Sequence, residues 1–266
     1  MYRISIRAAI GWALLSIYVF SMASAARGAG INDTGITSCY TDTTVGATGA
    51  TGVASDGGGF PRQDCRYGRD AAQAAGKLNK TGAGSKGFDF TRIDRDGNVL
   101  APGVTTNWTC TRDNVTGLIW EIKSTQGLRS QSYTYKWYKF DTAANGGEAG
   151  FASTTADTNV LCETAGRCDT EKFVQDVNAQ GLCGKADWRI PTRHELGSLL
   201  DYSRTSPTII DNIDYFPNTL ATDYWTDTPD ARYSGFAYQI DFNRGLTTSI
   251  AKGLAGGVRL VRSAAP

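Results

Sequence analysis

The sequence predicts a domain of the α+β class. Short segments in which apolar and polar residues alternate come first, two amphipathic helices follow, and further strand-like segments end the chain. With 31 glycines and 11% aromatic residues, the composition is typical of short strands joined by many turns. The order contains no repeated strand–helix–strand unit, which argues against a parallel α/β sheet.

The first 25 residues have the pattern of a secretory signal peptide. Arg3 and Arg7 form its basic start, residues 8–20 form an apolar run, and residues 23–25 supply the small side chains of a cleavage site. The apolar run is shorter than the ~20 residues that a transmembrane helix needs. We therefore expect an exported protein, periplasmic or extracellular, whose mature chain has no transmembrane segment.

The mature chain is nearly neutral. The full chain has 27 Lys and Arg residues against 26 Asp and Glu residues, and loss of the leader removes two of the basic ones. Such a balance gives no general attraction toward nucleic acid, so no nucleic-acid partner is expected. No glycine-rich phosphate-binding loop joins a strand to a helix, and no cofactor is expected. We divide the chain into the leader over residues 1–25, a loop-rich region over 26–105 and a folded domain over 106–266.

All six cysteines follow the leader, and an even number in an oxidising compartment predicts up to three disulfides. None stands in a Cys-x-x-Cys pair, so zinc or thioredoxin-like chemistry has little support. We expect Cys39 to pair with Cys65 in the N-terminal region. The other four are expected to pair within the second part of the chain, with their partners left open: Cys110, Cys162, Cys168 and Cys183.

The region before residue 106 is expected to hold little regular structure. Residues 41–59 are rich in Thr, Gly and Ala, which predicts a mobile loop. A short helix is predicted over 70–78, and a strand over 88–93 leads into a turn over 94–98. The acidic spacing of this turn invites a calcium site, but an EF-hand loop would need Glu where Thr105 stands, so we prefer a hairpin turn.

The predicted domain begins with strands and continues into a helix. Residues 107–123 predict a β-hairpin, and the aromatic run over 133–140 has strand character. A helix is predicted from Thr170 to residue 179, with Asp169 or Thr170 as its N-cap. Gly181 is expected to end this helix in the left-handed conformation.

The stretch over residues 181–202 is the one around which the domain is expected to be organised. Trp188 lies in a short extended segment, and Pro191 disfavours helix at the preceding residue. Thr192 and Glu195 form a capping box at the start of a helix whose leucines share one face. We assign structural roles to this stretch and to two other tryptophans: Trp120, Trp188, Pro191, Thr192, Glu195 and Trp225.

The remaining chain predicts strands. A loop held by aromatic residues spans 209–218, and a short strand follows over 224–226. Residues 236–242 alternate as a half-buried strand that turns at 243–245. Residues 258–262 predict the last strand.

The sequence contains a single histidine, His194, on the first turn of the capped helix. A Ser-His-Asp or Cys-His pair would need it beside a nucleophile in a cleft, but its position favours an exposed helix face. Acidic residues crowd the region after residue 200, either as carboxylate pairs for glycoside hydrolysis or, as we prefer, in turns and caps. These are Asp201, Asp211, Asp214, Asp223 and Asp227. We predict no catalytic residue and no metal site.

A local excess of basic residues gives a stronger candidate for a ligand-binding site. Between residues 232 and 262, five basic residues stand against one acidic residue, Asp241. Such a patch favours sulfated or carboxylated polysaccharide, because a guanidinium group forks onto paired oxygen atoms. The alternative is a solvated face of a strand-rich domain. The candidate ligand-binding residues are Arg232, Arg244, Lys252, Arg259 and Arg262.

Five blocks of the sequence, in order, resemble the Lcl C-terminal domain family. They cover residues 113–121, 177–196, 213–219, 224–226 and 258–262. The Arg-Ile-Pro-Thr-Arg-His-Glu helix start within the second block is similar to one in C-type-lectin-like and formylglycine-generating-enzyme folds. The resemblance implies a C-type-lectin-like domain with two helices and a twisted, mainly antiparallel sheet. The family's named member is a collagen-like bacterial adhesin whose terminal domain binds sulfated glycosaminoglycans.

The sequence also departs from that family. Val177 and Leu260 stand where many members carry cysteines, so an apolar contact would replace a covalent link. No cysteine follows Cys183, which counts against the oxidase chemistry of the formylglycine-generating enzymes. Residues 225–227 match a calcium-lectin motif only in part. No collagen-like repeat is present, so trimerisation is not carried over.

Three functions remain as hypotheses. The first is an exported binding or adhesion domain for an anionic polysaccharide or an envelope protein, and it is the one we prefer. The second is a structural subunit of a pilus or envelope assembly, and the third is an extracellular enzyme of the formylglycine-generating-like or hydrolase class. The oligomeric state is left open.

Overall fold

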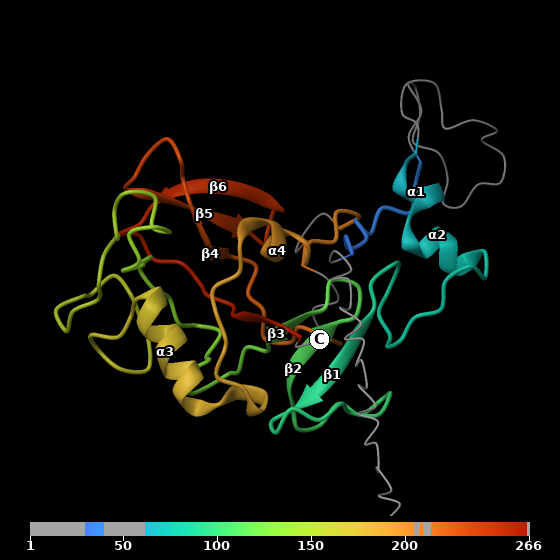
Figure 1. Ribbon diagram of the computed structural model, residues 1–266, viewed down its shortest axis with the longest axis horizontal. Coiled ribbons are helices and arrows are strands. Elements are labelled where there is room, and N and C mark those ends of the chain that lie inside the picture. The colour runs from blue at the N-terminus through green and yellow to red at the C-terminus, as the bar shows by residue number, and fades with distance from the viewer. Residues whose placement is uncertain (1–29, 40–61, 205–207, 210–213, 265–266) are drawn as a thin grey trace, which may run out of the picture.

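The computed structural model describes residues 30–39, 62–204, 208–209 and 214–264 (Figure 1). The expected signal peptide and the expected mobile loop over 41–59 lie outside these residues. Antiparallel strands and a few short helices make up the described chain, as the α+β class requires. None of the described helices is long and apolar enough to cross a membrane.

One antiparallel sheet has the strand order β1-β2-β3-β7. Its strands are β1 (Phe90–Asp94), β2 (Trp108–Asp113), β3 (Leu118–Glu121) and β7 (Val261–Ser263). The predicted hairpin over 107–123 is therefore present, and the last strand of the chain pairs with β3. The strand predicted over 258–262 begins only at Val261.

A second antiparallel sheet contains β4 (Asp223–Pro229), β5 (Phe236–Asp241) and β6 (Leu246–Ala251) in that order. The sequence predicted β4 and β5 but not β6. The aromatic run over 133–140 is not a strand. Four of its residues, 134, 135, 136 and 138, instead make isolated bridges to four separate segments, at Leu161, Gly256, Asp169 and Gly150.

Both predicted helices of the domain start as expected. In α3 (Thr170–Gln180) the Asp169 side chain accepts the Lys172 N–H, and Gly181 ends the helix at φ 63°. In α4 (Arg193–Gly197) both hydrogen bonds of the capping box between Thr192 and Glu195 are present. The helix α4 is only five residues long, so the buried Leu199 and Leu200 follow it rather than extend it.

The remaining helices are short. They are the 3₁₀ helix η1 (Leu182–Gly184), α1 (Asp64–Tyr67) and α2 (Arg69–Ala74). Figure 1 shows α1 and α2 at one side of the molecule, away from α3 and from the β4–β5–β6 sheet. The helix predicted over 70–78 is thus present as α2, which ends earlier, at Ala74.

Two clusters of buried side chains form the core. One lies against the β1–β2–β3–β7 sheet and includes Phe90, Trp120 and Phe216, and the other includes Trp137, Trp188 and Trp225. Val177 and Leu260 are both fully buried in the second cluster. They therefore supply core contact in the positions where the resemblance placed a pair of cysteines.

The N-terminal region is packed on the domain. Strand β1 is an integral part of the sheet, although the expected boundary at residue 105 separates it from β2. Asn32 donates to the Asp113 carboxylate at 2.8 Å, and Lys86 pairs with Asp201 at 2.5 Å. Residues on both sides of that boundary therefore form one sheet and share polar contacts.

Three disulfides use all six cysteines. The expected Cys39–Cys65 pair is present. Cys110 on β2 pairs with Cys183 on η1, and Cys162 pairs with Cys168 just before α3. The Cys110–Cys183 bond ties the sheet to the segment that leads into Trp188.

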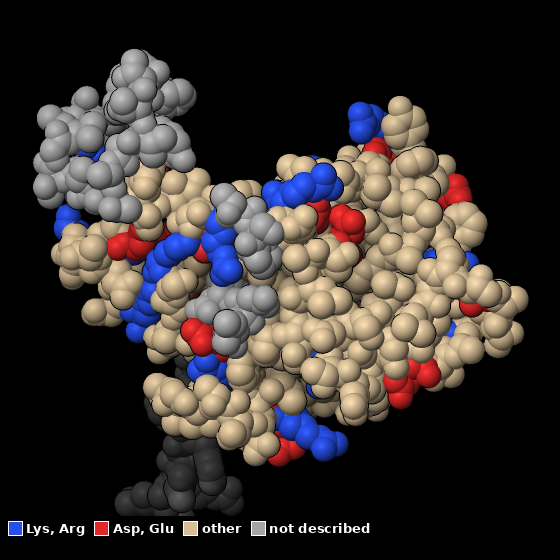
Figure 2. All heavy atoms as spheres, turned by 180° about the vertical axis from the view of Figure 1, so that it is seen from behind, with Lys and Arg blue, Asp and Glu red and all other residues tan. Residues whose placement is uncertain are grey.

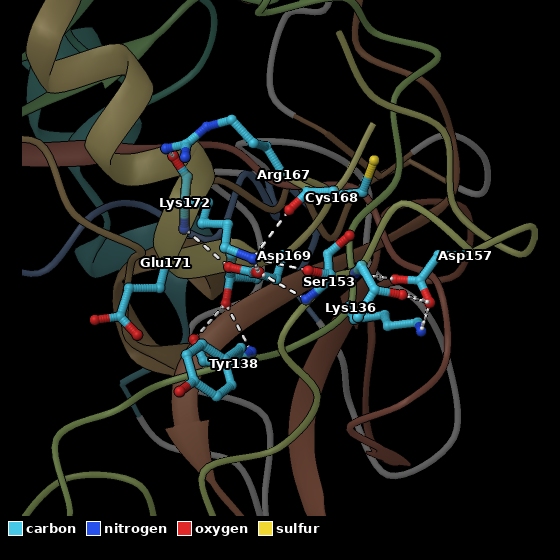
Figure 3. A network of polar contacts seen from close by, with 12 residues as sticks. Lys136, Tyr138, Ser153, Asp157, Arg167, Cys168, Asp169, Glu171 and Lys172 are labelled. Carbon is cyan, nitrogen blue, oxygen red and sulfur yellow. Dashed lines mark hydrogen bonds and ion pairs between the residues drawn. The ribbon is translucent and has the colours of Figure 1, made fainter. Parts of the chain in front are cut away.

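The long segment before α3 is fixed by a polar network around Asp169 (Figure 3). The fully buried Asp169 carboxylate accepts the Ser153 N–H at 2.8 Å and the Lys172 N–H at 2.9 Å, and it pairs with the Lys172 ammonium at 3.0 Å. Lys136 pairs with Asp157 at 2.7 Å. The Lys136 hydrogen bond holds the pKa of Asp157 at about 2. The N-cap of one helix thus also holds a loop in place.

Candidate functional site

The five basic residues between 232 and 262 do not form one exposed patch. Arg232 precedes β5 and Arg244 follows it, so these two exposed residues lie beyond opposite ends of that strand. Lys252 and Arg259 have exposed fractions of 0%, and Arg262 has 5%. The prediction of a shared ligand-binding surface was wrong for Lys252 and Arg259, which are fully buried.

Lys252 is buried because backbone carbonyl groups from two loops surround its ammonium group. It donates to the carbonyl oxygens of Asn145 at 2.8 Å and Glu148 at 2.6 Å, and to that of Ser234. The ammonium group also lies 4.3 Å from the centroid of the Trp137 ring. Lys252 therefore joins two loops inside the protein and offers no charge to a ligand.

Arg259 has a comparable internal role. It donates to the Glu121 carbonyl oxygen at 2.6 Å and to the Thr219 hydroxyl, and its guanidinium group lies 5.3 Å from the Phe216 ring centroid. Burial lowers the pKa of Arg259, and nearby Tyr224 and Glu121 oppose this effect. The residue links the segment before β7 to β3.

Arg262 and three basic residues outside the predicted set line two adjoining cavities beside the β1–β2–β3–β7 sheet. The cavities measure about 300 and 170 Å³, and both have Val99 and Arg112 in their walls. The larger cavity also contains Arg92, and the smaller one contains Lys185 and Arg262. We call this surface the cationic groove, defined by Arg92, Arg112, Lys185 and Arg262.

Strand register places two of these side chains on one face of the sheet. Arg112 on β2 is paired with Ile119 on β3, and Ile119 is paired with Arg262 on β7. Paired residues project from the same face, and neighbouring strands lie about 4.8 Å apart. Arg112 and Arg262 are therefore about 10 Å apart across the sheet.

Arg92 forms a fixed wall of the groove. Its Nε donates to the Asp214 carbonyl oxygen at 3.0 Å. Its guanidinium group lies 4.7 Å from the Trp108 ring centroid and 4.4 Å from the Tyr215 ring centroid. Such stacking immobilises the cation while leaving its charge in place.

The other cations of the groove differ in whether their side chains have a partner. Arg262 pairs with Asp187 at 2.6 Å, and this hydrogen bond lowers the pKa of Asp187. Arg112 and Lys185 are exposed, and neither forms a hydrogen bond or ion pair with a side chain in the described part of the chain. Within the described residues that line the two cavities, no Asp or Glu is present. Arg112 and Lys185 therefore present positive charge without a described side-chain partner beside apolar walls, whereas the charge of Arg262 is paired with Asp187.

Other basic residues are more fully paired. On the face drawn in Figure 2, Lys and Arg gather on the side of the molecule that carries α1 and α2, and elsewhere blue and red atoms mostly lie together. The basic residues near α2 include Lys80, which donates to the carbonyl oxygens of Gly84 and Lys86 at 2.7 and 2.6 Å. Arg69 pairs with Asp89 at 3.9 Å. Their charges serve internal contacts.

Two of the acidic residues after position 200 pair with lysines, and Asp223 lies opposite Asp241 in the register of β4 and β5. Asp201 pairs with Lys86, and Asp227 pairs with Lys139 at 2.6 Å. Burial raises the pKa of Asp227 against the opposing effect of Lys139. Asp211 lies outside the described residues. The carboxylate of Asp94 accepts the N–H groups of Asp96 and Asn98, as expected for a turn over residues 94–98.

His194 is exposed on α4, which agrees with the expected helix-face position. Trp188 has an exposed fraction of 2%, and its indole N–H donates to the Leu182 carbonyl oxygen at 2.9 Å. Trp120 and Trp225 are fully buried. The residues to which the sequence assigned structural roles thus lie in or beside the core.

Sequence reasoning did not find the cationic groove. Arg92 and Arg112 stood in segments correctly predicted as strands, but Arg92 is half-buried and neither strand alternates regularly between buried and exposed residues. The meeting of Arg112 with Lys185 and Arg262 depends on strand register and on the position of η1, whereas Arg92 pairs with Thr111 and so projects from the other face of the sheet. No local pattern determines these features.

The fold and groove define an α+β domain that presents positive charge between the loops flanking an antiparallel sheet. The chain belongs to the Lcl C-terminal domain family, whose family model matches residues 109–262. Arg112, Lys185 and Arg262 lie inside this match, and Arg92 lies before it. No curated protein matches the sequence.

Proposed function

We propose that this protein is an exported binding module that holds an anionic polysaccharide, or an acidic group of an envelope partner, in the cationic groove. The observation that carries the proposal is that Arg112 and Lys185 line the cavity walls without a described side-chain partner, beside Arg262, which is paired with Asp187. The proposal keeps the C-type-lectin-like arrangement as an expectation, supported by the helix start at residues 189–195.

The chemistry of the groove favours sulfate or carboxylate groups. A guanidinium group donates two parallel hydrogen bonds to paired oxygen atoms, and an ammonium group adds a compact point charge. Arg112 has no described polar partner that a ligand would have to displace. Val99, Leu100 and Pro102 provide apolar surface for the carbon framework of a ligand.

The two alternative functions, an extracellular enzyme and a structural subunit, have less support. All six cysteines form disulfides, which leaves no thiol for chemistry of the formylglycine-generating type. Asp201 and Asp227 each pair with a lysine, which weakens the hydrolase hypothesis for these two carboxylates. A structural subunit is compatible with the same fold, and an anionic partner on an envelope protein would use the same groove.

The direct test measures retention of the mature protein on an immobilised sulfated polysaccharide, with uncharged dextran as the reference matrix. The double variant Arg112→Ala/Lys185→Ala should elute at lower salt than the unchanged protein. A charge-assisted hydrogen bond contributes about 1.5 kcal/mol, so each lost contact should weaken binding by about tenfold.

The matched control is Arg232→Ala/Arg244→Ala, which removes the same number of exposed cations away from the groove. This control should elute with the unchanged protein. Equal losses in the two double variants would show that binding follows net charge and would refute the groove. Absence of retention for the unchanged protein would refute the proposal for sulfated polysaccharide.

A further inference from the structure

Strand β1 is an outer strand of the four-stranded sheet (Figure 1), and two other segments of the chain cover parts of its free edge. At one end of the strand, Phe90 and Ala83 exchange backbone hydrogen bonds. Further along, the Leu100 N–H donates to the Arg92 carbonyl oxygen. The two covering segments therefore meet β1 at separate places, with a gap in the cover between them.

The Arg92 N–H faces this gap. Phe90 bonds outward to Ala83, and alternate residues of an antiparallel strand face the same side, so the Arg92 N–H also points outward. A continued ladder would pair it with the Leu100 carbonyl oxygen, but no residue in the described part of the chain accepts it. Such a backbone donor needs an acceptor from water or from a ligand.

The sequence explains why the ladder stops after Leu100. Pro102 has no N–H to donate, and it disfavours the helical conformation at Ala101. The Val104 N–H then donates to the Ala101 carbonyl oxygen, and Gly103 adopts a φ of 86°. The chain therefore turns away from β1 directly beside the Arg92 N–H.

The larger cavity of the cationic groove lies where the two covering segments separate. Its walls include residues 81–83 from one segment, residues 99–103 from the other, and Phe90, Thr91 and Arg92 from β1. Successive residues of a strand project from opposite faces of a sheet. Because three successive residues line this cavity, it opens onto the edge of β1, to which the Arg92 N–H points.

Arg112 reaches the same cavity from β2. It is paired with Thr91 in the strand register, so the two side chains project from one face about 5 Å apart. The long Arg112 side chain can pass over Thr91 to the edge of β1, and Arg112 is among the residues that line the cavity. A backbone donor and a cation, neither with a partner among the described side chains, thus line one space of about 300 Å³.

The nearest buried carboxylate does not oppose an anion there. Asp89 has an exposed fraction of 3%, and its oxygens accept the N–H groups of Thr81 and Gly82 at 2.8 and 2.7 Å. The Asn114 side chain donates to it at 2.9 Å, and Arg69 pairs with it at 3.9 Å. Asp89 therefore fixes a wall of the cavity from behind.

We propose, on the basis of the function proposed above, that the Arg92 N–H and the Arg112 guanidinium group together hold one oxyanion of the ligand in the larger cavity. A guanidinium fork binds two oxygen atoms, and each oxygen keeps a lone pair for a further donor. The strand fixes the backbone donor, so no side-chain freedom is lost when it binds. Val99 and Pro102 then contact the carbon framework next to the oxyanion.

Backbone amide NMR spectra of the isotope-labelled mature protein test this subsite. The protein is titrated with sodium sulfate, and with sodium chloride at matched ionic strength. The Arg92 amide signal should shift with sulfate in a saturable manner and stay in place with chloride. Arg112→Ala should raise the sulfate dissociation constant at this signal by about tenfold, whereas Arg244→Ala, outside the groove, should leave it unchanged. An Arg92 signal that sulfate does not move, or equal losses in the two variants, would overturn the proposal.

Ala101→Phe tests the cavity without removing a charge. Ala101 is exposed and lines the cavity, so a phenyl ring at this position should fill part of the space. The variant should lose the sulfate-dependent shift of the Arg92 amide and should elute from the immobilised sulfated polysaccharide at lower salt. Ala165→Phe, at an exposed position outside the groove, is the matched control and should behave as the unchanged protein does. Thermal unfolding shows whether both variants are folded.

These measurements separate the subsite from the binding function on which it rests. If Arg112→Ala/Lys185→Ala loses retention on the polysaccharide while a folded Ala101→Phe keeps it, the groove binds its ligand and the subsite is refuted. If the unchanged protein is not retained, the polysaccharide function is refuted, and the sulfate titration still decides whether the Arg92 N–H and Arg112 hold an oxyanion.

Discussion

Lys123 and Glu121 form an ion pair of 3.1 Å in which both side chains are buried. Lys123 also donates to the Val258 carbonyl oxygen at 3.0 Å, and the second Glu121 oxygen accepts the Leu260 N–H at 2.8 Å. Burial lowers the pKa of Lys123, and Glu121 opposes this effect. Because Arg259 lies close by, a single carboxylate balances two buried cations and connects β3 to the segment before β7.

Glu121→Gln should therefore destabilise the protein more than Lys123→Met. The glutamine variant leaves two buried cations without a balancing charge, and loss of one partner of a buried pair costs about 3–5 kcal/mol. The methionine variant leaves Glu121 with Arg259 still nearby. Urea unfolding of both variants measures the difference, and a larger loss in Lys123→Met would contradict this account.

Lys252→Met should destabilise the protein by about 3 kcal/mol, because three buried carbonyl groups lose a donor and each hydrogen bond contributes about 1 kcal/mol. Arg244→Ala should leave stability nearly unchanged, because its side chain is largely exposed. Thermal unfolding of the two variants provides the comparison. Similar losses in both would contradict the structural role of Lys252.

The Cys110–Cys183 disulfide should contribute more stability than Cys162–Cys168. The first joins residues 73 positions apart and the second joins residues 6 positions apart. In the chain-entropy model, the free energy of unfolding falls by about 4 kcal/mol when Cys110–Cys183 is removed and by about 2 kcal/mol when Cys162–Cys168 is removed. Chemical denaturation of the paired Cys→Ala variants measures both values, and the reverse order would argue against this model.

Glu195 should make stability depend on pH. Burial alone would raise the pKa of its carboxyl group, but hydrogen bonds from Arg189 and Thr192 outweigh burial and lower that pKa. The stabilisation is therefore present above the unfolded carboxyl pKa of about 4.3 and is lost as pH falls through the lower folded value. Glu195→Gln should lose stability at neutral pH and show a smaller further loss in acid.

Thr192→Ala gives the control for that measurement. It removes the side-chain acceptor for the Glu195 N–H and should cost about 1 kcal/mol. In this variant the Glu195 carboxylate remains paired with Arg189, so most of the pH dependence of stability should persist. Melting temperatures of the three proteins across acidic pH make the test. Equal pH dependence in the unchanged protein and in Glu195→Gln would contradict the assignment.

Binding in the cationic groove should weaken steeply with salt. Ionic screening reduces attraction between exposed charges, and the Debye length falls from about 10 Å at 0.1 M to about 3 Å at 1 M salt. Arg112→Ala should therefore lower both the affinity and its salt dependence, while leaving thermal stability nearly unchanged. The measurement is titration with a soluble sulfated polysaccharide at several salt concentrations. Salt-independent binding would contradict an ionic site.

Helix starts could be predicted because their causes are local. Asp169 caps α3 through a residue three positions away, and Thr192 with Glu195 does the same for α4. The β2–β3 hairpin was also predictable from its turn and alternation. In contrast, the run over 133–140 has the alternation of a strand, but its residues bridge to four different segments. A strand requires a continuous partner, which its own sequence does not specify.

The cysteine count and the Cys39–Cys65 pair were available from the sequence, but the other two pairs depended on which loops meet in space. The same limit applied to charge. Lys252 and Arg259 resemble surface residues in sequence, yet carbonyl groups from distant loops give them partners inside the protein. A charged side chain can be buried only where such partners converge.

The sequence by itself determined the family, the α+β class, the capped helices and the buried tryptophans, because short-range hydrogen bonds and hydrophobic periodicity act within a few residues. Tertiary structure alone decided which cations reach the surface and how β2, β3 and β7 bring Arg112 and Arg262 onto one face. Those features arise from strand register and chain crossings, which join residues far apart along the chain.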